Sequence, residues 1–237
     1  MPRPVLVLWD VDHTLVRAGR GGVALYELVL AELYGLGLPA QLASMAGRTD
    51  TSIALEVLTA AGVDAVAELP RFHEALAGRA ADVAEMVRVQ GVVLPGVRQV
   101  LAAVAGHAAD GPVVQSLLTG NLPALAKVKL TALGLTEHLD FDIGGYGDVS
   151  SVRADLVPVA RRRAAVRYGV DFSGRATVLI GDTPHDVEAA AATGARSVGV
   201  ATGRFSAAEL AAAAADVVLP DLADTDRAVA AILGHEV

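Results

Sequence analysis

The stretch VLVLWDVDHT at residues 5–14 places two aspartates, Asp10 and Asp12, directly after a short apolar run. An apolar run of this length fits a strand that is buried on both faces, as in a parallel sheet. The two carboxylates would point to opposite faces if the strand continued, but both can approach one site if the chain turns after Asp10. Crowded carboxylates raise each other's pKa unless a cation neutralises them, and Mg²⁺ favours oxygen ligands. The stretch therefore indicates either a magnesium site at a strand end or an Asx turn that closes the strand.

A second apolar run, Val113–Leu118, leads into Thr119, Gly120 and Asn121. A hydroxyl and free amide N–H groups at the start of the following helix can hold a phosphate. We therefore predict that these three residues bind a phosphoryl group.

A third apolar run, Thr177–Ile180, leads into GDTPHD at residues 181–186 and so adds the carboxylates of Asp182 and Asp186. Each of the three motifs is a weak or moderate signal alone. Because they follow matching apolar runs, together they predict one site at the carboxyl edge of a sheet.

Strand and helix patterns alternate over most of the chain. Two weaker apolar runs also resemble strands, Ser197–Val200 and Asp216–Leu219. Three segments have helical patterns: Pro123–Leu133, Leu156–Tyr168 and Asp186–Thr193. This alternation predicts an α/β fold with a Rossmann-like, doubly wound parallel sheet.

The segment 17–90 differs from the rest because it has successive helical patterns and no convincing strand. The helical patterns are Val23–Tyr34, Thr51–Ala61 and Ala65–Val89, and a Leu-Pro-Gly turn at 94–96 marks the return to the core pattern. We expect an α-helical cap domain at 17–90, inserted into a core of residues 1–16 and 91–237. The alternative is that these helices simply cover the sheet.

The composition limits the classes of function. The 237 residues carry a formal net charge of −8, which argues against nucleic acid as a partner because phosphate backbones favour a basic surface. The absence of cysteine excludes thiol nucleophiles, disulfides and zinc thiolates. The sequence has neither the pattern of a signal peptide nor an apolar segment of about 18 residues, so we expect no membrane partner and a cytoplasmic location.

Taken together, these motifs resemble those of the haloacid dehalogenase-like superfamily over nearly the whole chain. DVDHT at residues 10–14 resembles its first motif, Thr119 its second, and Asp182 with Asp186 its fourth. The helical insertion resembles the cap of the phosphoglycolate phosphatase and β-phosphoglucomutase branch. The resemblance implies a Rossmann-like core, Mg²⁺ and an aspartyl-phosphate intermediate.

The same resemblance implies a role for each aspartate. Asp10 is the expected nucleophile, and Asp12 is the expected general acid and then general base. The metal is expected on Asp10, on the backbone carbonyl of Asp12 and on Asp182, with Asp186 orienting these ligands. Thr119 and the amides that follow it would stabilise the transferring phosphoryl oxygens.

The third motif of the family is where this chain departs from the pattern. The lysine that neutralises phosphate is missing there, and Arg153 is the nearest cation. A guanidinium can bind phosphate bidentately, so Arg153 is our candidate for that role. The alternative is a solvated arginine that caps a helix. Lys127 and Lys129, the two lysines of the chain, are expected at the surface or on a helix flank.

Substrate specificity is expected to come from the cap. The polar loop at residues 47–50 (GRTD) opens a helix, and Arg48 is our candidate for contacting the substrate when the cap closes. Helix capping by Thr49 or Asp50 is the alternative role for this loop.

The sequence thus predicts an enzyme, a magnesium-dependent phosphatase that hydrolyses a small phosphorylated metabolite. A phosphomutase of the β-phosphoglucomutase type would use the same two aspartates. A catalytically silent phosphate-binding protein on the same fold is the third possibility.

Overall fold

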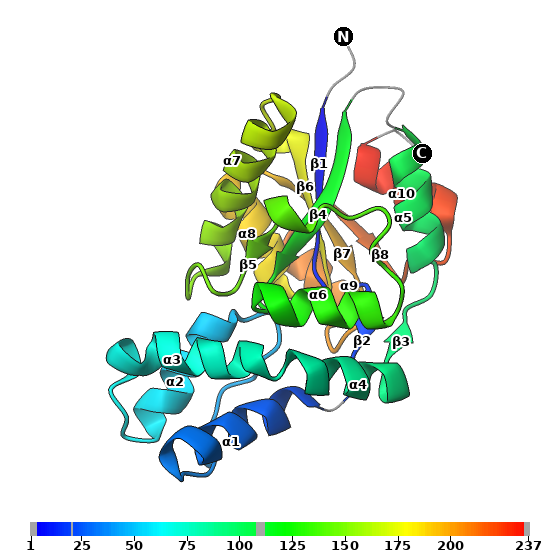
Figure 1. The fold of residues 1–237 in the computed structure, drawn as a ribbon. Helices are drawn as coiled ribbons and strands as arrows, with labels where there is room; N and C mark the ends of the chain where they lie inside the picture. The colour runs from blue at the N-terminus through cyan, green and yellow to red at the C-terminus, as the bar shows by residue number, and fades with distance from the viewer. Residues whose placement is uncertain (1–3, 20, 108–111, 235–237) are drawn as a thin grey trace.

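A six-stranded parallel sheet forms the centre of the protein, in a computed structural model that describes residues 4–19, 21–107 and 112–234 (Figure 1). The strand order is β5-β4-β1-β6-β7-β8. The strands are β1 (Val5–Trp9), β4 (Val113–Thr119), β5 (Gly145–Tyr146), β6 (Thr177–Gly181), β7 (Arg196–Val200) and β8 (Val217–Leu219). The five strands expected from the sequence are confirmed, and the very short β5 is an addition at the edge.

Helices cover both faces of this sheet (Figure 1). Alternate residues of β1 enter two separate apolar clusters, with Val7 and Trp9 on one face and Leu6 and Leu8 on the other. The first face is covered by α5 (Val97–Gly106), α6 (Pro123–Ala132) and α10 (Thr225–Leu233), and the second by α7 (Leu156–Tyr168) and α8 (Pro184–Thr193). A further helix, α9 (Ala207–Ala212), contacts β7 and β8. The doubly wound α/β core is therefore confirmed.

A helical cap lies between β1 and β4 in the chain and sits at the carboxyl edge of the sheet (Figure 1). Two short antiparallel strands, β2 (Val16–Arg17) and β3 (Val92–Val93), join it to the core. Its helices are α1 (Gly21–Tyr34), α2 (Asp50–Ala60), α3 (Ala65–Gly78) and α4 (Ala80–Gln90). The single helix expected at Ala65–Val89 is wrong, because the chain breaks into α3 and α4 after Gly78, a residue that disfavours helix continuation.

The cap has an apolar core of its own. Buried residues from its four helices form one cluster, which includes Tyr26, Leu30, Ile53, Leu58, Phe72, Leu76 and Val87. Leu122 and Leu125, at the start of α6, complete this cluster, and no residue of the sheet belongs to it. The cap thus packs on α6 instead of covering the sheet, although its bounds at residues 17–90 stay a prediction.

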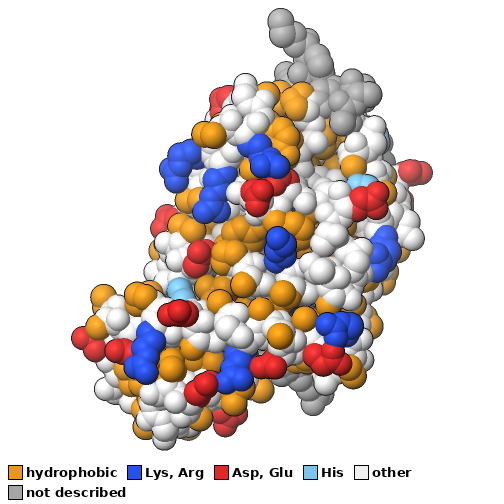
Figure 2. All heavy atoms as spheres, in the orientation of Figure 1, with side chains coloured by type: hydrophobic (Ala, Val, Ile, Leu, Met, Phe, Trp, Pro, Cys, Tyr) orange, Lys and Arg blue, Asp and Glu red, His pale blue; other side chains and the backbone are white. Residues whose placement is uncertain are grey.

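The outer surface of the cap carries charges of both signs, and Figure 2 shows them interspersed with hydrophobic side chains. Arg79 pairs with Glu32 and Asp82, and Arg88 pairs with Glu85. Exposed pairs of this kind contribute about 0–1 kcal/mol each, so the apolar cluster must provide most of the stability of the cap. Within the described part of the chain, every helix is too short or too polar to cross a membrane.

Candidate active site

A tight turn after β1 gives Asp10 and Asp12 different neighbours. The backbone N–H of Asp10 still donates to Ile180 in the sheet, at 2.8 Å. His13 then takes the left-handed conformation, with φ of 64°, and its N–H donates to Val16 at 2.7 Å. The carboxylate of Asp10 is consequently buried at the sheet edge, whereas that of Asp12 extends toward α6.

Three buried carboxylates converge at the ends of β1 and β6. Oxygen atoms of Asp10, Asp182 and Asp186 lie within 4.8 Å of one another. Asp182 directly follows β6, and Asp186 lies in the first turn of α8. Asp186 also closes a capping box, because its Oδ2 accepts hydrogen bonds from the N–H and the hydroxyl of Thr183, at 3.1 and 2.7 Å. We call these three aspartates the acidic cluster.

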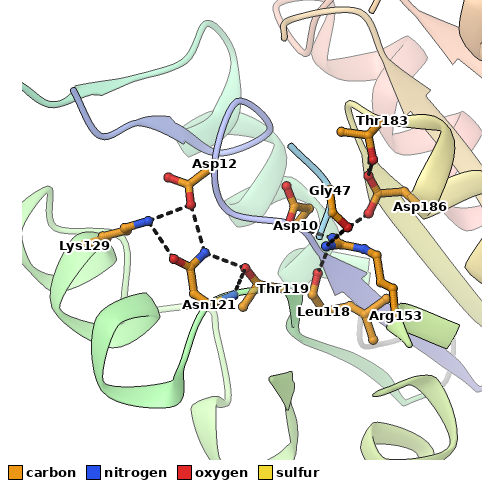
Figure 3. A network of polar contacts seen from close by, with 10 residues as sticks. All are labelled: Asp10, Asp12, Gly47, Leu118, Thr119, Asn121, Lys129, Arg153, Thr183 and Asp186. Atoms are coloured by element: carbon orange, nitrogen blue, oxygen red, sulfur yellow. Dashed lines mark hydrogen bonds and ion pairs between the residues drawn. The ribbon is translucent and has the colours of Figure 1, made fainter. Parts of the chain in front are cut away.

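Arg153 is the cation that bridges two members of the acidic cluster, Asp10 and Asp186, as Figure 3 shows. One terminal nitrogen of its guanidinium, at the start of a 3₁₀ turn (Arg153–Asp155), donates to Asp10 Oδ1 at 2.8 Å and to Asp186 Oδ1 at 2.6 Å. The same nitrogen contacts the carbonyl of Leu118, and the other terminal nitrogen contacts that of Gly47. The alternative of a solvated arginine is wrong, since Arg153 is only 7% exposed. A role in phosphate binding stays a prediction.

One guanidinium does not balance three carboxylates. Burial, with repulsion from Asp186 and Asp12, raises the pKa of Asp10 to about 7 despite the contact with Arg153. Burial, with repulsion from Asp10 and Asp186, raises the pKa of Asp182 to about 8. In the metal-free site Asp10 and Asp182 therefore hold protons near neutral pH, and a divalent cation that binds their ionised forms would displace these protons.

Asp12 lies in a second, separate network with α6 (Figure 3). Its Oδ2 accepts from Lys129 Nζ at 2.6 Å and from Asn121 Nδ2 at 2.8 Å. Lys129 also donates to Asn121 Oδ1 at 2.7 Å, and Asn121 Nδ2 donates to Thr119 Oγ1 at 2.7 Å. Desolvation alone would raise the pKa of Asp12, but the Lys129 ammonium and the two hydrogen bonds hold it below its ordinary value. We call Asp12, Asn121 and Lys129 the lysine network.

The expectation that Lys129 lies at the surface is therefore wrong. Its side chain is 13% exposed and faces Asp12, while Lys127 is exposed as expected. The sequence held a signal for this difference. Lys129 follows Leu125 by four residues and Ala126 by three, which places it on the buried stripe of the helix, whereas Lys127 falls on the opposite side.

The loop after β4 is held by the cap as well as by the core. The N–H of Asp50 donates to the carbonyl of Gly120 at 2.7 Å, and the carboxylate of Asp50 accepts from the N–H of Leu122 at 2.7 Å. A Cβ atom on Gly120 would lie 1.9 Å from the carbonyl oxygen of Arg48, so only glycine allows this approach. The cap is thus in contact with the predicted phosphate-binding residues.

Arg48 lies at the cavity, in the loop before α2, but its guanidinium is turned onto α2. It forms an ion pair with Glu56 and donates to the hydroxyl and the carbonyl of Ser52, at 2.8 and 3.0 Å. Thr49 caps α2, since its side chain accepts from the N–H of Ser52 at 3.1 Å. The capping role proposed for Thr49 is confirmed, and substrate contact by Arg48 stays a prediction.

A cavity of about 410 Å³ between cap and core joins the two networks. All of the site residues predicted from the sequence line it except Asp186: Asp10, Asp12, Arg48, Thr119, Gly120, Asn121, Arg153 and Asp182. Lys129, which the sequence analysis placed outside the site, also lines it. The predicted residues are therefore brought together at one cavity, with one addition.

The donor set of the acidic cluster fits a hard divalent cation. Carboxylate oxygens are the ligands that Mg²⁺ prefers, and three buried ones face each other here. The carboxylate of Asp12 belongs instead to the lysine network, so a metal would meet this residue only through its backbone carbonyl. The identity of the metal and the carbonyl ligand stay predictions.

Comparison with known proteins supports the resemblance seen in the motifs. Residues 152–225 match a family model described as HAD-hydrolase-like. A protein of Dickeya dadantii named "Probable phosphatase IndB" is 28% identical over 236 residues, which cover 96% of this chain and 94% of that one.

Solved structures share the fold at low identity. A predicted phosphatase from Clostridium acetobutylicum superposes with a TM-score of 0.65 and 18% identity, covering 98% of this chain and 99% of the other. A haloacid dehalogenase-like family protein from Streptococcus pneumoniae superposes with a TM-score of 0.61 and 13% identity, covering 96% of this chain and 99% of the other. The resemblance inferred from the motifs and the capped α/β fold are both confirmed.

Proposed function

We propose that this chain, a haloacid dehalogenase-like hydrolase by sequence match and by fold, is a magnesium-dependent phosphatase that acts on a small phosphorylated metabolite. The observation that carries the proposal is the convergence of Asp10, Asp182, Arg153 and Asp12 on one cavity. The relative named as a probable phosphatase, similar along almost the whole chain, supports the same reaction class. The cytoplasmic location expected from the sequence stays a prediction.

In the first step, an oxygen of the Asp10 carboxylate attacks phosphorus, and the bond between phosphorus and the leaving oxygen breaks. Asp12 gives its proton to that oxygen. Asp12 is ionised in the free site, and the negative phosphoryl group that enters beside it favours uptake of the proton to be donated. The product is an alcohol and a phosphoryl group covalently bound to Asp10.

In the second step, water attacks the phosphoryl group and displaces the Asp10 carboxylate. Asp12, now ionised, accepts the proton of the water. Inorganic phosphate leaves, and Asp10 returns to its starting form. Two moderate barriers thus replace the single high barrier of direct hydrolysis.

Arg153 and the loop after β4 are suited to hold the phosphoryl oxygens. The Nε atom of Arg153 is buried and has no hydrogen-bond partner among the described residues, so it retains a donor for a phosphoryl oxygen. The hydroxyl of Thr119 accepts from Asn121 and keeps its own proton to donate. When bound by Asp10, Asp182 and the Asp12 carbonyl, Mg²⁺ would offset the repulsion between the phosphate and the carboxylates.

A screen of phosphorylated metabolites with the purified chain and Mg²⁺ tests the proposal, with released inorganic phosphate as the readout. Phosphate release from at least one metabolite, well above that from a generic aryl phosphate, is the expected result. Conversion of a substrate to an isomer without phosphate release would identify a phosphomutase instead. Binding of a metabolite with no turnover at all would leave only the silent binding protein.

A further inference from the structure

Lys129 lies on the buried face of α6, although the general reaction scheme requires no lysine there. Lysine is rarely placed on the buried face of a helix, because its ammonium loses hydration there unless it is paired. Lys129 is paired twice, with Asp12 Oδ2 at 2.6 Å and with Asn121 Oδ1 at 2.7 Å. Its position is thus fixed by groups at the cavity and not by the helix surface.

These contacts treat the two oxygens of Asp12 differently. Oδ2 accepts from both Lys129 and Asn121, whereas Oδ1 has no hydrogen bond to any side chain or backbone group in the described ranges. The side chain of Asp12 is 37% exposed and lines the cavity. One oxygen is therefore anchored, and the other is left for a group in the cavity.

We propose that Lys129 is a positioning residue that holds Asp12 for the water-activating step, in which the aspartyl-phosphate on Asp10 is hydrolysed. This inference rests on the proposed function. In that step the bond from water oxygen to phosphorus forms, the bond from phosphorus to the Asp10 oxygen breaks, and the proton of the water passes to Oδ1 of Asp12. Lys129 contacts neither the water nor the phosphorus and acts through Asp12 alone.

The first step depends less on this anchor. Departure of an activated aryl leaving group needs little proton transfer, so Asp12 can be poorly oriented without slowing phosphorylation of Asp10. Water is a weak nucleophile and needs the base in place. Loss of Lys129 should therefore slow the second step selectively and let phosphorylated Asp10 accumulate.

The test is the pre-steady-state hydrolysis of nitrophenyl phosphate by Lys129→Met and, as a matched control, Lys127→Met on the same helix. In Lys129→Met, kcat and KM should fall together by about 10- to 100-fold, and kcat/KM should change little. Nitrophenol should appear in a burst that approaches one equivalent per active site. Lys127→Met, whose side chain is exposed, should behave like the wild type.

Two further variants separate positioning from a merely structural effect. Lys129→Arg keeps a cation and should restore much of kcat. In an Asp12→Asn background, Lys129→Met should cause no further loss of kcat, because the residue that it positions is already inactive. If Lys129→Met fails to fold, Lys129→Gln takes its place in all these measurements.

Equal falls in kcat and kcat/KM without a burst would overturn the inference, as would an undiminished effect of Lys129→Met in the Asp12→Asn background. Unchanged kinetics of Lys129→Met would overturn it too. The proposed function fails separately, and visibly, if the wild type releases no phosphate from any substrate.

Discussion

The acidic cluster and the lysine network lie on the same cavity and use the same residue type in opposite ways. In the acidic cluster, three buried carboxylates lie close together, only Asp10 and Asp186 pair with the Arg153 guanidinium, and the pKa values of Asp10 and Asp182 are raised. In the lysine network, the single, partly exposed carboxylate of Asp12 accepts hydrogen bonds from the Lys129 ammonium and the Asn121 amide, and the pKa of Asp12 is lowered. Two aspartates only two residues apart in the chain are thereby made chemically different.

This difference indicates which ligands or reactions each network is suited to. The acidic cluster has more carboxyl groups than Arg153 can balance if all of them are ionised, so it is suited to receive a further cation and a phosphoryl group. The lysine network is balanced without any ligand and is suited to move protons. The following predictions change one network while the other serves as the reference.

The largest effect is expected from Asp10→Asn, which removes the nucleophile. Turnover should fall by at least about 10³-fold, because an amide can neither attack phosphorus in this way nor bind Mg²⁺ well. Thermal unfolding should be unimpaired, since one of three mutually repelling carboxylates is removed. Phosphate release is the assay, with Asp142→Asn as the control because that side chain is 79% exposed. Substantial activity in Asp10→Asn would refute its role as nucleophile.

Removal of the metal should act mainly at the acidic cluster, which supplies the carboxylate ligands, and should abolish activity. Chelation should reduce phosphate release to background, Mg²⁺ should restore it, and Ca²⁺ should inhibit because its looser coordination misaligns Asp10. Full activity in excess chelator, with no metal in the preparation, would contradict this account.

The same cluster should make the effect of Mg²⁺ on stability depend on pH. Folding raises the pKa of Asp10 and Asp182 from 3.8 to about 7 and about 8. In the metal-free protein, proton binding by these two carboxyl groups stabilises the folded state. This contribution is fully present below pH 3.8 and is lost as the pH rises through the pKa values of the folded state. Since Mg²⁺ binds the ionised carboxylates, its stabilisation should grow over the same range. A Tm increase that is independent of pH would place the metal elsewhere.

Substitution of Arg153 tests the one cation of the acidic cluster. Removing one partner of a buried ion pair costs about 3–5 kcal/mol, so Arg153→Ala should lose stability as well as turnover. The loss of stability should be smaller in acid, where the carboxyl groups become neutral. Arg153→Lys keeps the charge but not the bridging geometry, and should recover stability more than kcat/KM. Urea unfolding and steady-state kinetics measure the two quantities. Wild-type kinetics in Arg153→Lys would show that the guanidinium geometry is not used.

The smallest effect is expected from Arg48→Ala. Because Arg48 is paired with Glu56 and Ser52, its loss should change kcat/KM by less than about fivefold, and equally for the natural metabolite and an aryl phosphate. A much larger loss on the metabolite would instead support substrate contact by Arg48, the role suggested by the sequence.

The sequence allowed much of the site to be predicted because strand ends are marked locally. An apolar run followed by aspartate identified Asp10 and Asp182, and the parallel sheet then required that they meet. Lys129 was missed because its partner is 117 residues away in the chain, and only its place on the buried face of α6 indicated it. The burial of Arg153 could not be predicted from the sequence either, because it depends on two carboxylates from other elements.

The covalent intermediate offers the most direct test of the central claim, that Asp10 is the nucleophile of a phosphatase. The enzyme is mixed with substrate and Mg²⁺, quenched in acid during turnover and reduced with borohydride, which converts an aspartyl-phosphate to homoserine. Mass spectrometry of the peptide that contains residues 5–14 should then find homoserine at position 10 and aspartate at position 12, and the signal should be stronger in Lys129→Met. Aspartate retained at position 10 during active turnover, or homoserine at another position, would contradict the account.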